Sequence, residues 1–413
     1  MTEVASNGAA LLAGPDPRAG AEDFAAHTAR LGALRTGRQS VLDTLARSGL
    51  RGRGGAAFPT ATKWRSVASR RADSVVLVNG AEGEPLSQKD RVLMESRPHL
   101  ILDGAVLAAR ATGARQIMHY IGASHTGAVA AMRRAINERP DAERRAMRLV
   151  EAPQRYVSGE ETAAVHFVND GTALPTALPP RPFERGVHGR PTLVQNVETL
   201  AHVALIARHG DAWFRAVGGG GSSGTALVTV SGAVPATSVH EVDGSAVIAD
   251  AVNLAGGLTS DSDAVLLGGY FGSWIPAARA WGLPLDSGAL SKRGLSLGSG
   301  VIGVLASSDC GVQMSSRIAT YLADESSRQC GPCTFGLRAI ATAMHRMATM
   351  HASTDDLAHV QRWAGLLPGR GACRHPDGAA IMVRSALQVF AGDFSLHVHE
   401  HRCTVSAAVA RAA

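Results

Sequence analysis

The sequence predicts an α/β protein with a mostly parallel sheet, followed by a small α+β module and a helical C-terminal region. Three observations predict this. Strand-like apolar runs alternate with helical spacing from 74 to 150, a glycine-rich linker precedes a second set of strands, and the spacing is helical after 311. We therefore expect a loose N-terminal segment at 1–24, an α/β domain at 25–217, an α+β module at 218–308, a helical domain at 309–400 and a tail at 401–413.

The first domain supplies the strands and helices of the parallel sheet. Residues 25–48 have helical spacing, and residues 74–79 form a continuous apolar run typical of a buried strand. Such strands, separated by helices, pair in parallel, and ligands bind beyond their carboxyl ends, where the acidic turn 80–85 lies. Further strands are expected at 116–121 and 147–150, and helices at 100–111 and 128–137.

Beyond this domain, residues 218–224 have the composition of a linker. Strands are expected at 226–232 and 264–267, with a helix at 246–254. Gly298-x-Gly300-x-x-Gly303 matches a dinucleotide-binding pattern, but it runs into a strand at 301–305 and not into a helix, which argues against that function. In the helical region, Met344 and Met347 recur at helical spacing and are expected in the core.

The stretch with the clearest ligand chemistry is the glycine loop, residues 49–64. Four glycines fall within seven residues, two arginines lie among them and Lys63 follows, a combination that suits a phosphate group. Gly52-x-Gly54-x-x-Ala57 loosely matches a dinucleotide fingerprint, but that fingerprint requires a preceding strand and the residues before the loop have helical spacing. The loop is thus interpreted as a phosphate-binding loop, with a flexible surface turn as the alternative.

Composition limits the classes of protein to be considered. The 413 residues are 45% hydrophobic and 18% charged, as in a globular chain. The net charge of +6 comes from dispersed basic residues, which argues against nucleic acid and allows an acidic protein partner. No apolar run reaches the ~18 residues of a membrane span, and the N-terminus does not resemble a secretion signal. The five cysteines do not suit a disulfide framework, so we expect a cytoplasmic protein without direct membrane insertion.

Four of the five cysteines lie in the last 85 residues. Cys330-Gly-Pro-Cys333 opens a helix, with Cys373 further along the chain. A thioredoxin-type redox pair would need a preceding strand, and here a helix is expected. Zinc bound by these three cysteines and His375, an iron–sulfur cluster, or inert cysteines are the other interpretations, and spacing alone favours the cluster.

Four motifs in order resemble the flavin-binding (51-kDa, or F) subunit of respiratory NADH:quinone oxidoreductase and its relatives in NAD-dependent hydrogenases and formate dehydrogenases. The family's Gly-Leu-Arg-Gly-Arg-Gly-Gly-Ala-Gly-Phe-Pro-Thr-Gly-x-Lys-Trp is residues 49–64, with Ala57 and Ala61 in place of two glycines. Its Asn-Ala-Asp-Glu-x-Glu-Pro is 79–85, its Tyr-x-Cys-Gly-Glu-Glu-Thr-Ala is 156–163, and its Gly-Lys-Pro-Thr-x-x-Asn-Asn-Val-Glu-Thr-Leu is 189–200. The resemblance covers roughly residues 25–400.

The resemblance implies FMN in the α/β domain, a β-grasp (SLBB-like) module and a helical bundle with a [4Fe–4S] cluster. It also implies that the flavin itself carries the chemistry, so that no side chain is catalytic. The cofactor-binding residues implied for FMN or NAD(H) are Gly52, Arg53, Gly54, Gly55, Phe58, Lys63, Asn79, Glu82, Glu84, Gly159, Glu160, Glu161, Arg181, Gln195, Asn196 and Thr199. Among these, Glu84 and Glu161 would bind the ribose hydroxyls of NADH.

The chain departs from the family at several positions. Ala81 replaces an aspartate, and Gln195 replaces the first asparagine of a pair. Of three phenylalanines that sandwich the nicotinamide nucleotide in relatives, Phe58 is kept, while Ser66 and Arg181 stand in the other two positions. The expected metal ligands are Cys330, Cys333 and Cys373, with Ser327 where relatives have the first cysteine, so the cluster could be [4Fe–4S] or [3Fe–4S]. His375 and Cys403 are further candidates for the fourth ligand.

The predicted function is that of an NADH dehydrogenase-like flavoprotein within a larger enzyme. It would oxidise NADH or NADPH and pass electrons through the iron–sulfur cluster to a protein or quinone acceptor. A ferredoxin-like or [2Fe–2S] partner subunit is expected beside it. The alternatives are a flavoprotein that exchanges electrons with ferredoxin without NAD(H), a non-catalytic assembly subunit, and a thiol-disulfide enzyme that uses Cys330 and Cys333.

Overall fold

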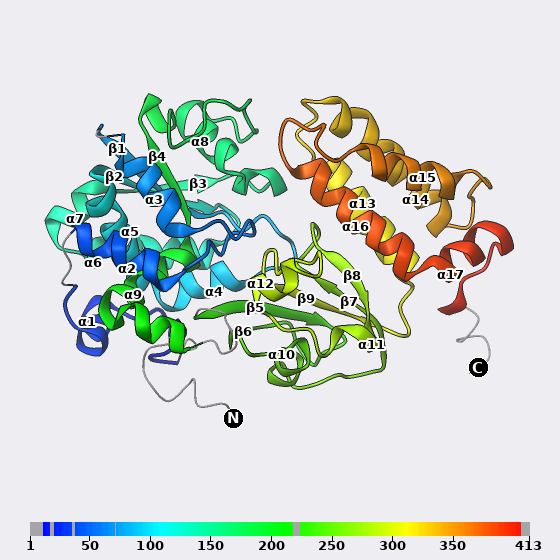
Figure 1. Cartoon of the computed structure of the whole chain (residues 1–413), viewed down its shortest axis with the longest axis horizontal. Helices are drawn as coiled ribbons and strands as arrows, with labels where there is room; N and C mark the ends of the chain where they lie inside the picture. The colour runs from blue at the N-terminus through cyan, green and yellow to red at the C-terminus, as the bar shows by residue number, and fades with distance from the viewer. Residues whose placement is uncertain (1–10, 17–19, 35–37, 71, 218–223, 406–413) are drawn as a thin grey trace. The chain divides into compact units, whose positions relative to one another are not determined.

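The computed structural model describes residues 11–16, 20–34, 38–70, 72–217 and 224–405 (Figure 1). Contacts between residues group the chain into two compact units. The first runs to Val228 and includes Glu241–Ala246 and Leu285–Gly288; the second holds Thr229–His240, Val247–Pro284 and the chain from Ala289 onward. Of the predicted linker 218–224, residues 218–223 lie outside the described residues. The grouping does not separate the α+β module from the helical region.

The first unit contains a sheet of four parallel strands in the order β3-β2-β1-β4. The strands predicted at 74–79, 116–121 and 147–150 are present, and the fourth, β4, is an addition that the sequence reasoning did not name. The bounds of the elements are β1 Ser74–Gly80, β2 Ala114–Gly122, β3 Met147–Ala152, β4 Thr192–Asn196, α1 Phe24–Leu31, α2 Arg38–Ser48, α3 Thr60–Ala68, α4 Lys89–Ser96, α5 Pro98–Thr112, α6 Thr126–Glu138, α7 Asp141–Ala146, α8 Glu161–Asp170 and α9 Val197–Ala216, with short 3₁₀ turns η3 Tyr156–Gly159 and η4 Val187–Gly189.

Helices cover both faces of this sheet, which explains the nearly uninterrupted apolar run of β1. On one face α5 packs against β1 and β2 and also against α9. The two helices come unusually close at Gly104, where a side chain would collide with the backbone of Leu200. On the other face the core includes Val75 and Leu77 of β1 with Val165 of α8. The sheet is thereby held from both sides, and α9 is fixed in position where it begins.

The second sheet has five strands in the order β6-β5-β9-β7-β8 and is mixed. Strands β5 and β9 pair in parallel, and β7 pairs antiparallel with both β9 and β8. The pattern Gly298-x-Gly300-x-x-Gly303 leads into β9, as expected, and not into a helix. The bounds are β5 Thr225–Gly232, β6 Ser238–Asp243, β7 Ser262–Leu267, β8 Ser273–Pro276, β9 Val301–Ala306, α10 Ile248–Leu254, α11 Ala277–Ala280 and α12 Ser287–Ser291.

The C-terminal region is a bundle in which α13 and α15 each pack against both α14 and α16 (Figure 1). Met344 and Met347 are fully buried in it, as their spacing predicts. Two π-helical turns interrupt the regular helices, and each carries a cysteine or histidine side chain. The bounds are α13 Gly311–Asp324, the π-turn η5 Pro332–Leu337, α14 Arg338–Ala348, α15 Asp356–Leu366, α16 His375–Val389, α17 Ala391–Ser395 and the π-turn η6 Leu396–Glu400.

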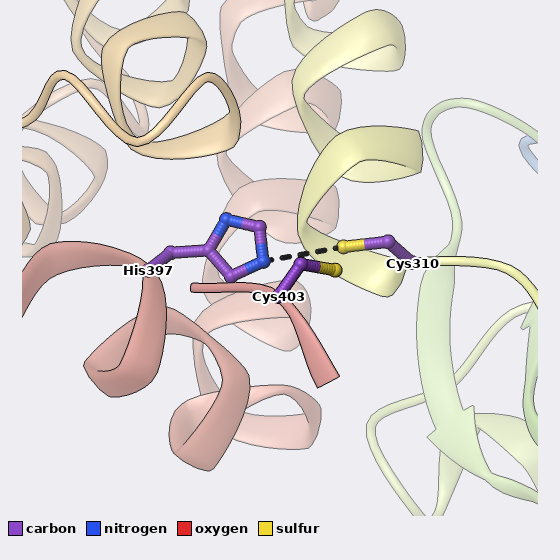
Figure 2. Close-up of side chains that lie close together, drawn as sticks. All are labelled: Cys310, His397 and Cys403. Carbon is purple, nitrogen blue, oxygen red and sulfur yellow. Dashed lines mark hydrogen bonds between the residues drawn. The ribbon is translucent and has the colours of Figure 1, made fainter. Parts of the chain in front are cut away.

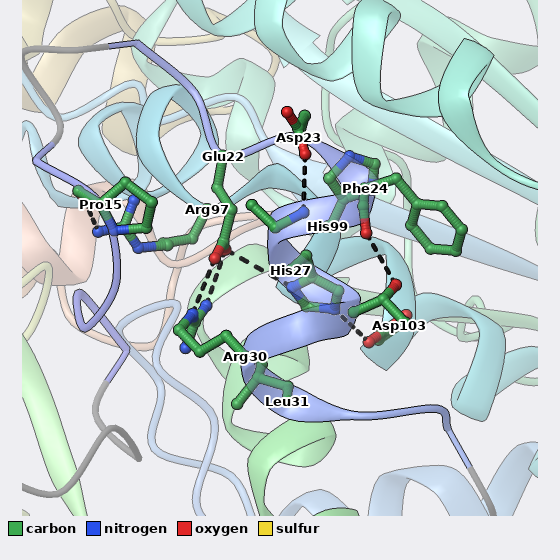
Figure 3. A network of polar contacts seen from close by, with 12 residues as sticks. Pro15, Glu22, Asp23, Phe24, His27, Arg30, Leu31, Arg97, His99 and Asp103 are labelled. Carbon is green, nitrogen blue, oxygen red and sulfur yellow. Dashed lines mark hydrogen bonds and ion pairs between the residues drawn. The ribbon is translucent and has the colours of Figure 1, made fainter.

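The described part of the segment predicted to be loose is held by polar contacts (Figure 3). Leu11 is fully buried, and the buried Arg97 guanidinium donates to the carbonyls of Leu12, Ala13 and Pro15. Hydrogen bonds between side chains far apart in the sequence supply this order, and apolar periodicity carries no trace of them.

No single helix in the described ranges is both long and apolar enough to span a membrane. One bent pair, His375–Val389 with Ala391–Glu400, passes by length and composition alone.

Candidate functional site

The parallel sheet changes direction between β1 and β4. From β1 the chain adds β2 and then β3 on one side, whereas β4 joins on the other. In open parallel sheets such a switch point opens a crevice at the carboxyl ends of the strands, where ligands bind. Asn79 and Asn196 are register partners at those ends of β1 and β4. The two predicted site asparagines, which are far apart in the sequence, are therefore neighbours.

Each of these asparagines holds a segment that forms the crevice. The Asn79 amide donates to the Gly159 carbonyl at 2.8 Å and so joins the end of β1 to η3. Asn196 caps α9, because its side-chain oxygen accepts from the Glu198 N–H at 3.0 Å. Its amide nitrogen donates to Asp90 at 2.6 Å. The crevice is thus built by side chains that a ligand would also meet.

The glycine loop folds back on itself and lies against Asn196. Gly52 N–H donates to the Phe58 carbonyl at 2.9 Å. A Cβ added at Gly54 would stand 3.2 Å from the Asn196 Cβ, so the backbone approaches the end of β4 closely only because this residue is glycine. Gly55 has φ of +102° and Ala57 has φ of +48°, the left-handed region that favours glycine. The loop lies between α2 and α3, with no strand before it, as predicted.

An anion would be well received at the start of α3. In the described chain no side chain caps this helix, whose N-cap is Pro59, so its first-turn N–H groups are available. The Thr60 hydroxyl is buried and makes no hydrogen bond to any described residue. Lys63 adds positive charge in the first turn, and its Nζ lies 2.9 Å from a Glu161 oxygen. Together these donors fit the phosphate of a nucleotide such as FMN.

Arg53 is oriented away from this anion position. Its backbone N–H donates to the Thr199 hydroxyl at 2.8 Å, and its guanidinium donates to the Thr225 carbonyl at 2.8 Å. Its Nε lies 4.0 Å from a Glu198 carboxylate oxygen. We conclude that Arg53 and Thr199 position the loop, and that the charge of Arg53 is balanced within the protein.

The acidic turn after β1 is fixed by Glu82. Its carboxylate accepts from the N–H groups of Asp90 and Arg91 at 2.9 and 2.8 Å, and from the Ser87 hydroxyl at 2.7 Å. Burial, reinforced by the nearby Asp90 carboxylate, raises the pKa of Glu82 to about 7. Gly83 passes so close to η3 that a Cβ would lie 2.7 Å from the Tyr156 carbonyl oxygen. The turn is therefore pre-formed.

The other predicted acidic residues face different partners. Glu84 is buried and accepts from the Tyr156 hydroxyl at 3.0 Å. Glu160 caps α8, since its carboxylate accepts from the N–H groups of Thr162 and Ala163, and burial raises its pKa. Glu161 is the partner of Lys63 and is partly exposed. Gly159 precedes Glu160 in η3 and lies beside Ala81.

Sequence reasoning missed a group of buried charges beneath the asparagines. Lys89 is buried, and its Nζ donates to Asp90 at 2.7 Å and to Glu198 at 2.8 Å. Burial would raise the pKa of Glu198, but Lys89 and other cationic neighbours lower it to about 2. Glu198 stands inside the 189–200 motif, and Lys89 and Asp90 follow the acidic turn closely. Their position beside two motifs was the one signal that pointed to them.

Gln195 has different surroundings from the other residues of the predicted binding set. Its side chain is buried, and its carbonyl accepts from the Trp64 indole N–H at 3.2 Å. Alternate residues of a strand face opposite sides, so Gln195 points into the sheet packing while Asn196 points to the crevice. This contact suits a residue that positions α3 through Trp64, and not one that touches a ligand.

The residues expected to face a nicotinamide nucleotide are more exposed. The Phe58 ring is 51% exposed, and Arg181 is exposed with its backbone N–H bonded to Glu184. The Ser66 hydroxyl donates to the Thr62 carbonyl within α3. Phe58 thus offers one aromatic surface to solvent on the glycine loop.

In the helical bundle, the four predicted metal ligands surround Cys333. The Cys333 thiol forms hydrogen bonds with Cys330 and Ser327, and Cys373 is near enough to influence its titration. Burial, together with Cys330, raises the pKa of Cys333 to about 12. Cys333 lies on the π-turn η5, and single π-turns are frequent at functional sites. Three thiols and one hydroxyl fit an iron–sulfur cluster better than an isolated thiol pair.

The two other candidates for the fourth ligand have different neighbours. His375 Nε2 lies 2.7 Å from the Leu322 carbonyl, and its ring packs edge-on against Phe271. Cys403 lies with Cys310 and His397 in a separate group. Ser327 therefore remains the best-placed fourth ligand.

Comparison with known proteins gives matches over most of the chain. Residues 45–205 match the Nuo51 FMN-binding domain, and residues 313–397 match the NADH-ubiquinone oxidoreductase-F iron-sulfur binding region. The second of the F subunits of NADH-quinone oxidoreductase in Rhizobium meliloti (strain 1021) is 32% identical over 88% of this chain and 90% of its own. The HndC subunit of the NADP-reducing hydrogenase of Solidesulfovibrio fructosivorans is 28% identical over 88% of this chain and 77% of its own.

A solved structure of an NAD⁺-reducing [NiFe]-hydrogenase in the air-oxidized state contains a chain of the same fold. Its TM-score is 0.79 at 32% identity over 88% of the present chain. The present chain spans 63% of the length of that hydrogenase chain.

Proposed function

The chain belongs to the family of the flavin-binding F subunits of NADH-quinone oxidoreductase, and from that premise we propose that it is an FMN-binding, NADH-oxidising subunit with an iron–sulfur group. The observation that carries the proposal is the crevice at the β1/β4 switch point, where Asn79, Asn196 and the glycine loop meet. When bound, FMN would supply a two-electron acceptor for hydride and a one-electron donor to iron–sulfur centres.

The residues proposed to hold FMN follow from the donors of the crevice. The uncapped start of α3, the Thr60 hydroxyl and Lys63 would bind its phosphate. The glycines 52, 54 and 55 let the backbone approach, and Asn79 and Asn196 present amides to the remaining polar atoms. Glu82, Glu160, Thr199, Arg53 and Gln195 would hold these elements in position by the hydrogen bonds described above.

The nicotinamide nucleotide is proposed to enter over the loop. Phe58 would stack on a ring with its exposed face, and Arg181 would offer a guanidinium to stack or to bind phosphate. Glu161, which holds Lys63, and Glu84, which holds Tyr156, would address ribose hydroxyls by exchanging partners. NADPH is the second donor to compare, since one relative is named as part of an NADP-reducing hydrogenase.

Cys330, Cys333, Cys373 and Ser327 are proposed as ligands of the iron–sulfur group. Ser327 already hydrogen bonds Cys333, so a ligand atom at this position lies within the set. Ser327→Cys is expected to raise the iron retained per chain and to slow its loss in air, because thiolate binds iron more strongly than a hydroxyl oxygen. Equal iron retention in both proteins would show that residue 327 is not a ligand.

Relatives of this chain are named as subunits of larger enzymes. We propose that the chain works beside a ferredoxin-like or [2Fe–2S] partner subunit that accepts its electrons. A cytoplasmic location is proposed as well, because all five cysteines are free thiols in the described chain.

Anaerobic cofactor analysis and rapid-mixing spectroscopy test the proposal. Purified protein is expected to release FMN on extraction, and NADH is expected to bleach its flavin absorbance within a turnover. Lys63→Met is expected to reduce flavin content, while Arg65→Met, an exposed residue on the same helix, leaves it unchanged. Protein without extractable flavin contradicts the proposal. Reduction by ferredoxin but by neither NADH nor NADPH supports the ferredoxin-linked alternative.

A further inference from the structure

Cys310, His397 and Cys403 come together in the helical bundle although they are far apart in the sequence (Figure 2). One ligand atom from each lies within 4.8 Å of the other two. His397 is fully buried, Cys403 is 3% exposed and Cys310 is half-buried. Cys310 and Cys403 also lie outside the range 313–397 that matches the iron-sulfur region of the family. The group therefore needs an explanation of its own.

The group lies at the opposite end of the bundle from the proposed iron–sulfur ligands. Cys310 is the N-cap of α13, whose 14 residues extend ~21 Å before the chain reaches Ser327. Helix α14 begins after Cys333 and ends at Ala348, beside the carbonyl that His397 contacts. Neither cysteine of the group can thus share an iron–sulfur cluster with Cys333.

The geometry of the group suits one small metal ion. His397 Nε2 lies 3.5 Å from the Cys310 sulfur. A tetrahedral zinc ion with Zn–S of ~2.3 Å and Zn–N of ~2.0–2.1 Å places sulfur and nitrogen ligands ~3.6 Å apart. The Cys403 thiol is within hydrogen-bonding reach of Cys310. The three ligand atoms are therefore already spaced as a shared ion would require.

The orientation of His397 is fixed by a second contact. Its Nδ1 lies 3.0 Å from the Met347 carbonyl, which can only accept, so Nδ1 carries the proton and Nε2 presents its lone pair to the sulfurs. A backbone carbonyl on the far ring nitrogen is the usual support of a metal-bound histidine. His397 lies on η6, the second π-turn of the bundle, as Cys333 lies on the first.

Cys403 is also held in place. His401 Nδ1 lies 3.0 Å from the Met350 carbonyl, and the Thr404 hydroxyl donates to Asp393 at 3.0 Å. These two contacts fasten the chain on both sides of Cys403, one to the residues that follow α14 and the other to α17.

We propose that Cys310, His397 and Cys403 bind one Zn²⁺ ion, with water as the fourth ligand on the side of the half-buried Cys310. Thiolate and imidazole select a borderline-soft ion over Mg²⁺ or Ca²⁺. Each thiol releases its proton to solvent as its Zn–S bond forms, so two thiolates, a neutral imidazole and Zn²⁺ leave no net charge in a buried site. The site joins the start of α13 to the chain beyond α17. It is independent of the proposed flavin function.

Metal counting on the full-length protein tests the site. The chain, with its flavin and iron–sulfur group, is purified anaerobically and dialysed against metal-free buffer, and its zinc, iron and flavin are measured. We expect one zinc per chain, and a zinc X-ray absorption spectrum with two sulfur ligands at ~2.3 Å and nitrogen or oxygen ligands at ~2.0–2.1 Å. Cys310→Ser, His397→Gln and Cys403→Ser are each expected to reduce retained zinc at least tenfold without changing flavin or iron.

Two matched controls separate this site from its surroundings. His399→Gln changes an exposed histidine on the same π-turn and is expected to keep the zinc. Cys373→Ser is expected to lower iron and keep the zinc. If a cysteine variant fails to fold, a zinc chelator should lower the melting temperature of the wild type and leave that of His397→Gln unchanged. Wild type that retains no zinc with reduced thiols, or that carries a Cys310–Cys403 disulfide after anaerobic purification, overturns the proposal.

Discussion

At the scale of single residues, backbone conformation explains where this chain departs from its family. Ala57 and Ala61 both stand where relatives have glycine. Ala57 has φ of +48°, whereas Ala61 lies inside α3 and is buried. Only the first position requires the left-handed region, so only there does glycine have a conformational advantage.

Ala57→Gly is therefore expected to stabilise the protein by about 0.5–1 kcal/mol. The left-handed conformation costs alanine about 1–2 kcal/mol, and the greater entropy of unfolded glycine cancels part of the gain. Ala61→Gly is the matched control and is expected to destabilise α3 by about 0.5–1 kcal/mol. Thermal melts of the three proteins measure both changes, and equal effects of the same sign would contradict the assignment.

Gln195 illustrates a residue whose role depends on its partner. Its contact with the buried indole of Trp64 predicts that Gln195→Asn, the family's residue, leaves the indole N–H without an acceptor. We expect a loss of stability of about 1–2 kcal/mol with unchanged FMN content. Denaturation curves and flavin extraction on the same preparations check this. Loss of flavin at unchanged stability would instead make Gln195 a direct ligand of FMN.

At the scale of elements, α1 is joined to α5 by buried charges (Figure 3). His27 Nε2 lies 2.7 Å from Asp103, and Arg30 donates twice to Glu22. Burial alone would raise the pKa of Glu22 and lower that of His27, but the hydrogen bonds of the network reverse both shifts. The pKa of Glu22 falls to about 2 from an ordinary value of 4.5. Helix α1 is short, so these contacts, and not its own propensity, keep it folded.

Glu22→Gln is expected to destabilise the protein by about 1–3 kcal/mol at neutral pH. Because the folded-state pKa of Glu22 is depressed, its contribution is present above pH 4.5 and is lost as the pH falls toward about 2. The stability difference between variant and wild type should therefore shrink over that window in denaturation curves. Asp141→Asn, at an exposed ion pair with Arg144, is the control and should cost under ~0.5 kcal/mol at any pH.

At the scale of the whole molecule, the two cofactor sites belong to different compact units. The crevice residues lie in the unit that ends at Val228, and the cysteines lie in the other. Each site is built from contacts within its own unit. The two groups are thus expected to load independently.

Gly54→Leu and Cys333→Ser test this independence. A side chain at Gly54 would collide with Asn196, so the first variant is expected to lose at least tenfold of its flavin and to keep its iron. The second should lose iron and keep its flavin, because Cys333 is the centre of the ligand set. Flavin and iron assays on each variant measure both quantities. Loss of both groups in either variant would show that the units fold or load together.

Several features of the protein follow from the sequence by itself. Apolar periodicity identifies β1, β2, β3, β5, β7 and β9, because strand and helix periods are local properties of the chain. The glycine loop, the acidic turn and the paired cysteines carry their chemistry in the residue types themselves. The motifs in their order identify the family. These features need no knowledge of what packs against what.

Tertiary structure alone decides which side chains meet. Strand register places Asn79 beside Asn196, and the alternation of β4 turns Gln195 inward to Trp64. Folding of the loop commits Arg53 to Thr225 and Glu198. The packing of helices in the bundle brings Cys310 to His397 across 87 positions. Such contacts depend on pairing between distant segments, which leaves no period or spacing in the sequence.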